Sequence, residues 1–289
     1  MTVSRLDVTV TAGDGTNLAG WWYAAEGDGR RPAVVLSHGF SAIKSMGLDG
    51  YAQLFSAAGL NCLVYDHRGY GDSGGAPRHE SDPWQQVHDM RDAITWLRRR
   101  DDVDGERIGL WGTSFAGGHV LTVAALDRRV KAVVSQVPLV RGLDTFNAWV
   151  PEDRRARFLD RLIADREARA LGAAPQTVAA ALPGSETEEW ARATSPDGAY
   201  ANEVTIRSLE LLREYEPHAF IERIAPVPLL LVIAAHDTQT PTTWQQEAFA
   251  RAGEPKRLVE LDCRHYDPYS SHFEEAAAAA RDWFVDHLI

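Results

Sequence analysis

The chain has 289 residues, of which 45% are hydrophobic, and its nine tryptophans add to the apolar material available for the core of one large domain. A formal net charge of −11 with no clustered basic stripe argues against a nucleic-acid partner. The N-terminus has no apolar signal core, and the apolar runs are too short to span a bilayer. We therefore expect a cytoplasmic protein with no membrane partner; the sequence leaves homo-oligomer formation open.

The first half of the chain alternates between strand and helix patterns. Residues 6–11 and 18–23 alternate polar and apolar side chains around a Gly-Asp-Gly turn, which predicts an edge β-hairpin. Short apolar runs then predict buried parallel strands, and apolar residues three or four apart predict helices. In chain order these are a strand at 33–37, a helix at 48–58, a strand at 61–65, a helix at 84–99, a strand at 107–111, a helix at 117–126 and a strand at 130–136. This order predicts an α/β fold with a mostly parallel, doubly wound sheet.

The alternation stops after Pro138 and returns near residue 228. Residues 141–216 show amphipathic helical segments interrupted by prolines and no convincing strand, so we predict an inserted helical cap. The predicted organisation is a core at 1–139, a cap at 140–216 and the rest of the core at 217–289. The resumed pattern predicts a strand at 228–234, a helix at 242–252, a strand at 257–261 and a helix at 272–288. The arginines at 154, 155, 157, 161, 166 and 169 interleave with acidic residues, which predicts a solvated, ion-paired face rather than an anion site.

The stretch Gly112-Thr113-Ser114-Phe115-Ala116 is the most informative motif. It joins a predicted strand to a predicted helix, and a serine at such a sharp turn is typical of a nucleophile elbow. The small neighbours Gly112 and Ala116 allow the helix to pass close to the strand. The alternative is a serine that only caps the helix, so the rest of the sequence must decide.

A serine nucleophile needs a general base and a carboxylate that orients this base. Asp237 follows the strand at 228–234 and His265 follows the strand at 257–261, so both stand at carboxyl ends of strands, in the chain order Ser, Asp, His. His272 is the rival base, although Ser270-Ser271 resembles the cap of the final helix and would place His272 in its first turn. The sequence offers three further candidates with less support: His236, Asp262 and Asp267.

Attack on a carbonyl also requires donors for the developing oxyanion. We predict the backbone N–H of Phe115, directly after the serine, and that of Phe40 in Ser37-His38-Gly39-Phe40. Phe146 and Trp149 are candidates for the pocket wall, with helix packing as the alternative. Cys62 and Cys263 form no metal-ligand spacing or disulfide framework, so we expect free thiols, no metal and no cofactor.

Three motifs together resemble the serine α/β-hydrolase superfamily: HGF at 38–40, DHRGYGDSGG at 66–75 and WGTSFAGG at 111–118. The chain is similar in particular to bacterial and fungal esterase-like and thioesterase-like hydrolases and to polyketide acyltransferases. The 66–74 segment is expected to brace the oxyanion segment. The resemblance implies an α/β-hydrolase fold and cleavage of a small-molecule carboxylic ester or thioester through an acyl-enzyme. Acyl transfer with the same residues and a non-catalytic ligand-binding protein are the alternatives.

Overall fold

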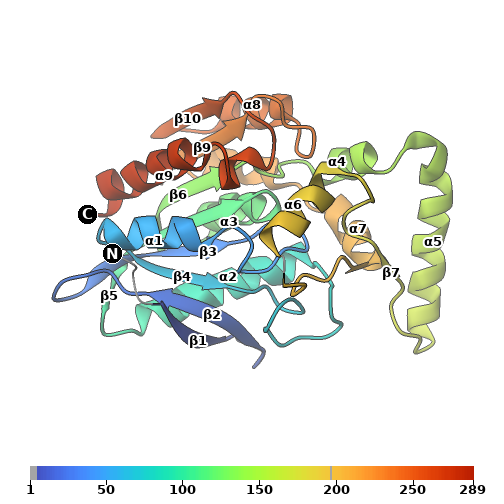
Figure 1. Cartoon of the computed structure of the whole chain (residues 1–289), viewed down its shortest axis with the longest axis horizontal. Coiled ribbons are helices and arrows are strands. Elements are labelled where there is room, and N and C mark those ends of the chain that lie inside the picture. Colours follow the sequence, from blue (N-terminus) through green and yellow to red (C-terminus); the bar gives the residue numbers. More distant parts are fainter. Residues whose placement is uncertain (1–4, 196) are drawn as a thin grey trace.

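The computed structural model describes residues 5–195 and 197–289, and its centre is an eight-stranded sheet with strand order β1-β2-β4-β3-β5-β6-β9-β10 (Figure 1). The strands are β1 (Arg5–Thr11), β2 (Asn17–Tyr23), β3 (Arg31–Ser37), β4 (Asn61–Tyr65), β5 (Val103–Thr113), β6 (Val130–Gln136), β9 (Leu229–Ala234) and β10 (Lys256–Leu261). The hairpin β1–β2 and the pair β2–β4 are antiparallel, whereas every other neighbouring pair is parallel. The predicted fold class, a mostly parallel sheet with a hairpin edge, is confirmed.

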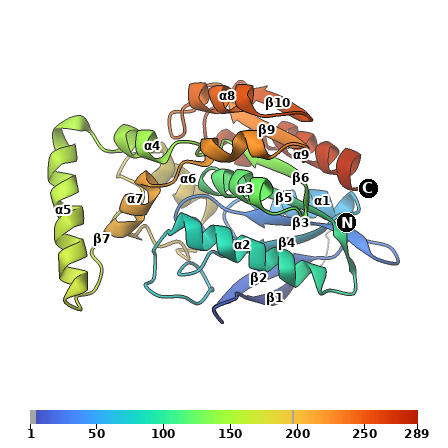
Figure 2. The same ribbon diagram turned by 180° about the vertical axis from the view of Figure 1, so that it is seen from behind.

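Helices cover both faces of the sheet and close a core on each side. One face carries α1 (Asp49–Ala57) and α9 (Phe273–Leu288), and the other carries α2 (Pro83–Arg98), α3 (Phe115–Leu126) and α8 (Thr242–Arg251), as Figures 1 and 2 show from opposite sides. Strands such as β4 and β9 are buried along their whole length because both of their faces are covered. None of the helices within the described residues is long and apolar enough to traverse a bilayer.

The sequence between β6 and β9 is mostly helical, and we call residues 140–216 the inserted segment. Its elements are α4 (Gly142–Trp149), α5 (Glu152–Ala170), β7 (Thr177–Val178), α6 (Glu186–Thr194), β8 (Val204–Thr205) and α7 (Ile206–Arg213), and the short helix η1 (Pro217–Arg223) leads back to β9. The antiparallel pair β7–β8 corrects the expectation that this segment has no strand; each strand is two residues long, too short to give a period-two pattern. Figures 1 and 2 show α5 at the edge of the molecule, away from the sheet.

Candidate active site

Ser114 occupies a single-residue turn between a strand and a helix. It separates β5 from α3 and has φ 54° and ψ −117°, a backbone conformation that costs a non-glycine residue free energy. Its N–H donates to the Gln136 carbonyl at 2.9 Å, which holds the turn against β6. A Cβ at position 112 would lie 2.2 Å from the Ala116 carbonyl oxygen, so the close passage of the helix requires Gly112. The Ala116 side chain fits into this close packing and is fully buried.

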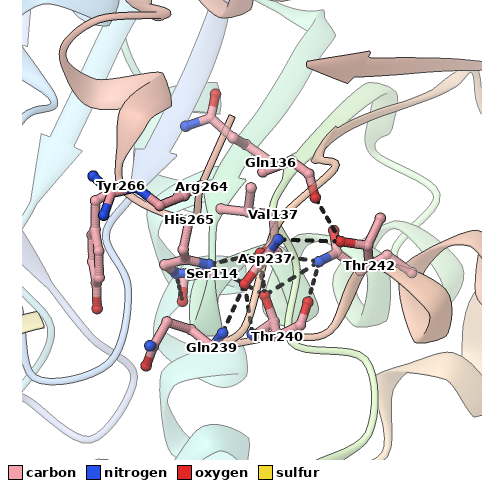
Figure 3. Close-up of polar contacts among 12 residues, drawn as sticks. Ser114, Gln136, Val137, Asp237, Gln239, Thr240, Thr242, Arg264, His265 and Tyr266 are labelled. Atoms are coloured by element: carbon pink, nitrogen blue, oxygen red, sulfur yellow. Dashed lines mark hydrogen bonds and ion pairs between the residues drawn. The ribbon is translucent and has the colours of Figure 1, made fainter. Parts of the chain in front are cut away.

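The side chains of Ser114, His265 and Asp237 form a hydrogen-bonded chain (Figure 3). His265 Nε2 lies 3.1 Å from Ser114 Oγ, and His265 Nδ1 lies 2.8 Å from Asp237 Oδ2. Asp237 follows β9 and His265 follows β10, and the parallel register of these strands places both loops at one edge of the sheet. The side chains of His265 and Asp237 are 2% and 0% exposed, so their pairing takes place out of bulk water.

Asp237 is held by donors on both of its carboxylate oxygens. Oδ1 accepts the backbone N–H groups of Gln239 and Thr240, each at 2.9 Å, and Oδ2 accepts the Thr240 hydroxyl at 2.9 Å and the Gln245 amide at 3.2 Å. Burial by itself raises the pKa of Asp237, but the charge and hydrogen bond of His265 and the hydrogen bonds of Thr240 outweigh it, so the pKa lies below its usual value. The carboxylate is therefore ionised at neutral pH and fixes the ring orientation of His265.

The rival residues occupy other positions. His272 immediately precedes α9, which begins at Phe273, and its Nδ1 lies 3.1 Å from Ser271 Oγ. The helix thus starts one residue later than predicted, and no side chain caps it. His236 Nε2 contacts the exposed Asp262 at 2.7 Å, on the surface.

One group of possible metal ligands lies beside the His265 loop. The ligand atoms of Cys263, Asp267 and His272 lie within 4.8 Å of one another, a proximity that their sequence spacing does not indicate. Burial, together with nearby carboxylates, raises the pKa of the Cys263 thiol to about 12, so in the absence of a metal the sulfur keeps its proton at neutral pH. We assign no metal to this group, and the expected absence of a metal stays a prediction.

The segment after β3 packs directly against the serine. A Cβ at Gly39 would lie 3.1 Å from Ser114 Cβ, so only glycine allows this approach without displacement. His38 Nδ1 lies 3.1 Å from the Gly39 carbonyl oxygen, and its Nε2 accepts the His67 N–H at 3.2 Å. The imidazole is therefore neutral and donates from Nδ1, in agreement with the lowering of its pKa by burial.

This hydrogen bond also orients the next peptide N–H. In a trans peptide the carbonyl and the N–H point in opposite directions, so fixing the Gly39 carbonyl toward His38 turns the Phe40 N–H the other way. Phe115 is the first residue of α3, and its N–H has no partner within the helix. The rings of Phe40 and Phe115 meet edge to face at 5.3 Å, which shows that the two predicted donor segments are neighbours.

A buried lysine, which no sequence pattern indicates, ties this segment to the 66–74 loop. Lys44 Nζ contacts Asp66 Oδ2 and Asp72 Oδ2, both at 2.6 Å, and the Lys44 N–H donates to Asp66 Oδ1 at 2.6 Å. Asp66 therefore pairs with Lys44, whereas Arg68 pairs with Asp89. A lysine in a short loop gives no periodic pattern, so only the fold reveals its partner.

Ser114 and His265 face a cavity of about 610 Å³ between the sheet and the inserted segment. Trp149 lines this cavity, and its indole N–H donates to the Gln239 carbonyl at 3.0 Å, next to Asp237. Phe146 does not line it: this side chain is 1% exposed and packs on Phe158, so the prediction that it forms the pocket wall is corrected in favour of helix packing. The wall contributed by the inserted segment includes Val178, Leu182, Trp190, Tyr200 and Leu209.

The sequence matches the family model of the alpha/beta hydrolase fold over residues 32–270. The chain belongs to the α/β-hydrolase fold family. This α/β-hydrolase is 32% identical over 271 residues to the thiohydrolase aneE of Aspergillus aculeatus, an alignment that covers 88% of this chain and 83% of that protein. It is also 32% identical over 304 residues to the polyketide transferase grgF of a Penicillium species, which covers 99% of this chain and 98% of that protein.

A crystal structure of the α/β-hydrolase GrgF from Penicillium sp. sh18 superposes on this α/β-hydrolase with a TM-score of 0.88 and 29% identity, over 99% of both chains. The match therefore extends through the inserted segment as well as the sheet. The resemblance to thioesterase-like hydrolases and polyketide acyltransferases, stated from the three sequence motifs, is confirmed.

Proposed function

We propose that this α/β-hydrolase cleaves a carboxylic ester or a thioester through an acyl-enzyme formed on Ser114. The observation that carries the proposal is the buried chain from Ser114 Oγ through His265 to Asp237, with distances of 3.1 and 2.8 Å, at the floor of a cavity. A serine hydroxyl with an imidazole in hydrogen-bond reach, itself oriented by a carboxylate, is the arrangement that makes serine a nucleophile at neutral pH. The family match and relatives named thiohydrolase support the same chemistry.

In the first half of the reaction Ser114 Oγ attacks the substrate carbonyl carbon while His265 Nε2 takes the hydroxyl proton. The carbonyl π electrons move to oxygen, and the Phe40 and Phe115 N–H groups stabilise the resulting oxyanion. When the carbonyl re-forms, the bond to the leaving alcohol or thiol breaks, and His265 returns the proton to this group. The products of this half are the free alcohol or thiol and an ester of Ser114. Asp237 remains ionised and stabilises the imidazolium that forms transiently.

In the second half a water molecule replaces the leaving group in the cavity. His265 takes a proton from the water, the hydroxide oxygen attacks the acyl carbon, and Ser114 leaves with the proton from His265. An alcohol, amine or thiol in place of water would give acyl transfer by identical steps. This second candidate is favoured by the similarity to proteins named acyltransferase drtE and polyketide transferase grgF.

The expected partner is a small-molecule ester or thioester with an apolar acyl part, because Phe40, Trp149 and Leu209 line the cavity. A net charge of −11 supports the expectation that nucleic acid is not a partner. Action in the cytoplasm and the absence of a membrane partner stay predictions, and homo-oligomer formation stays open.

A fluorophosphonate probe tests the proposal, because it phosphonylates only an activated serine. We expect the wild-type protein to be labelled and Ser114→Ala to remain unlabelled, with Ser135→Ala as a matched control that changes a buried serine of β6. Absence of labelling in the wild-type protein would support the alternative of a ligand-binding protein without turnover. Labelling that persists in Ser114→Ala would place the nucleophile elsewhere.

A further inference from the structure

The charged residues that line the cavity are of one sign. The chain contains 41 acidic and 30 basic residues, yet no Asp, Glu or Lys occurs among the cavity-lining residues of the described chain. Apart from histidines, the basic residues among those that line the cavity are Arg154 and Arg161. A protein with net charge −11 repels anions over most of its surface, so a cavity wall without carboxylates and with two arginines stands out from the rest of the molecule.

Both arginines come from one face of α5. Arg154, Phe158 and Arg161 follow each other at spacings of four and three residues, so their side chains lie in a row along the helix, and all three line the cavity. Figures 1 and 2 place α5 at the edge of the molecule, away from the sheet that carries Ser114. The row therefore forms the part of the wall contributed by the outermost helix.

The two arginines differ from others on the same helix in how they are paired. Arg166 contacts Glu210 at 2.7 Å and Arg169 contacts Asp165 at 2.7 Å, which fulfils the expectation of an ion-paired face for these two residues. Among the described residues, Arg154 has its one ion pair with the neighbouring Asp153 at 4.0 Å, the outer limit of an ion pair. Arg161 lies over the Phe158 ring at 5.8 Å. The prediction of a wholly ion-paired face is thus corrected: among the described residues Arg166 and Arg169 have close ion pairs, Arg154 has one at 4.0 Å, and Arg155, Arg157 and Arg161 have none.

We propose that Arg154 and Arg161 bind an anionic oxygen group, a carboxylate or a phosphate, that the substrate carries at a distance from its scissile carbonyl. The inference rests on the proposed function, because it assumes that the carbonyl reacts at Ser114. An apolar spacer would lie along Phe158, Val178, Leu182 and Leu209, and the anion would reach the guanidinium groups at the outer wall. Arginine suits this role because its planar donor fork matches the two oxygens of a carboxylate or phosphate.

The anion has two chemical sources, and matched substrates distinguish them. For an anion on the acyl side, para-nitrophenyl half esters of adipic, suberic and sebacic acids are compared with the para-nitrophenyl esters of hexanoic, octanoic and decanoic acids. For an anion on the leaving group, phosphorylated hexanoyl-pantetheine is compared with hexanoyl-pantetheine. The readout in each pair is the ratio of kcat/KM for the anionic substrate to kcat/KM for its neutral partner, which cancels changes common to both.

We expect Arg154→Gln/Arg161→Gln to lower one of these ratios about tenfold relative to the wild-type protein, and each single variant to lower it less. High salt should lower the wild-type ratio in the same direction, because it screens the exposed guanidinium groups. Arg157→Gln is the matched control: Arg157 lies on the same helix and outside the cavity lining, so both ratios should stay at wild-type values.

The outcomes separate this inference from the proposed function. A fall in the diacid ratio identifies an acyl-side anion, and a fall confined to the pantetheine ratio identifies a leaving-group phosphate. Turnover of the neutral esters with both ratios unchanged in the double variant would overturn the inference and leave the proposed function standing. Failure of the wild-type protein to turn over any substrate or to react with the fluorophosphonate probe would overturn both.

Discussion

Replacing Asp237 by asparagine tests the orienting role of this carboxylate. Oδ1 accepts two backbone N–H groups, from Gln239 and Thr240, so in Asp237→Asn the amide oxygen should take this place. The amide NH₂ then takes the place of Oδ2, 2.8 Å from His265 Nδ1, and also faces the Gln245 amide donor. A donor at this position stabilises the tautomer of His265 that carries its proton on Nε2. This tautomer cannot accept the hydroxyl proton of Ser114.

We expect kcat/KM for para-nitrophenyl butyrate to fall about 10⁴-fold, the size of effect expected when an imidazole is held in the wrong tautomer. This corresponds to about 5.4 kcal/mol of transition-state stabilisation. Asp262→Asn is the matched control, because Asp262 also contacts an imidazole, that of His236 at 2.7 Å, but is exposed. Circular dichroism checks folding of both variants. A loss below tenfold in Asp237→Asn, or an equal loss in Asp262→Asn, would refute the reasoning.

Three further predictions concern backbone strain, the oxyanion segment and acid stability. Because Ser114 has φ 54°, Ser114→Gly should be more stable to urea than Ser114→Ala by about 1 kcal/mol, and equal stabilities would contradict the strain argument. Gly39→Ala places a Cβ 3.1 Å from Ser114 Cβ and should lower kcat about tenfold while the protein stays folded; unchanged kcat would show that the segment yields freely. Although burial raises the pKa of Asp127, hydrogen bonds from Arg129 lower it below 3.8 overall, so its contribution to stability is present above this value and lost as pH falls below it. Asp127→Asn should therefore flatten the decline of the unfolding free energy below about pH 4, measured by urea titration; a decline as steep as in the wild-type protein would contradict this.

The sequence was sufficient for those features that depend on local pattern and chain order. Continuous apolar runs predicted β4 and β9 because strands buried on both faces admit few polar residues. Ser114, Asp237 and His265 were selected because each follows a strand, and parallel strands bring their carboxyl ends to one edge of the sheet. The two-residue strands β7 and β8 gave no usable pattern because their pairing depends on contacts far apart in the chain.

The sequence does not predict the features that depend on side-chain direction. Phe146 and Trp149 stand three residues apart on α4, yet Trp149 lines the cavity and Phe146 packs on Phe158, and the sequence does not show which face of α4 meets the cavity. The pairing of Lys44 with Asp66 joins two loops, and no periodic pattern connects them. The sequence also does not predict that Arg161 lines the cavity, because this depends on how α5 lies against the rest of the inserted segment.

The most direct test of the central claim is mass spectrometry of the protein quenched with acid during turnover of a para-nitrophenyl ester. We expect the wild-type protein to gain the mass of one acyl group, on the peptide that contains Ser114, and Ser114→Ala to gain none. An acyl group on another residue, or ester turnover that persists in Ser114→Ala, would contradict this claim.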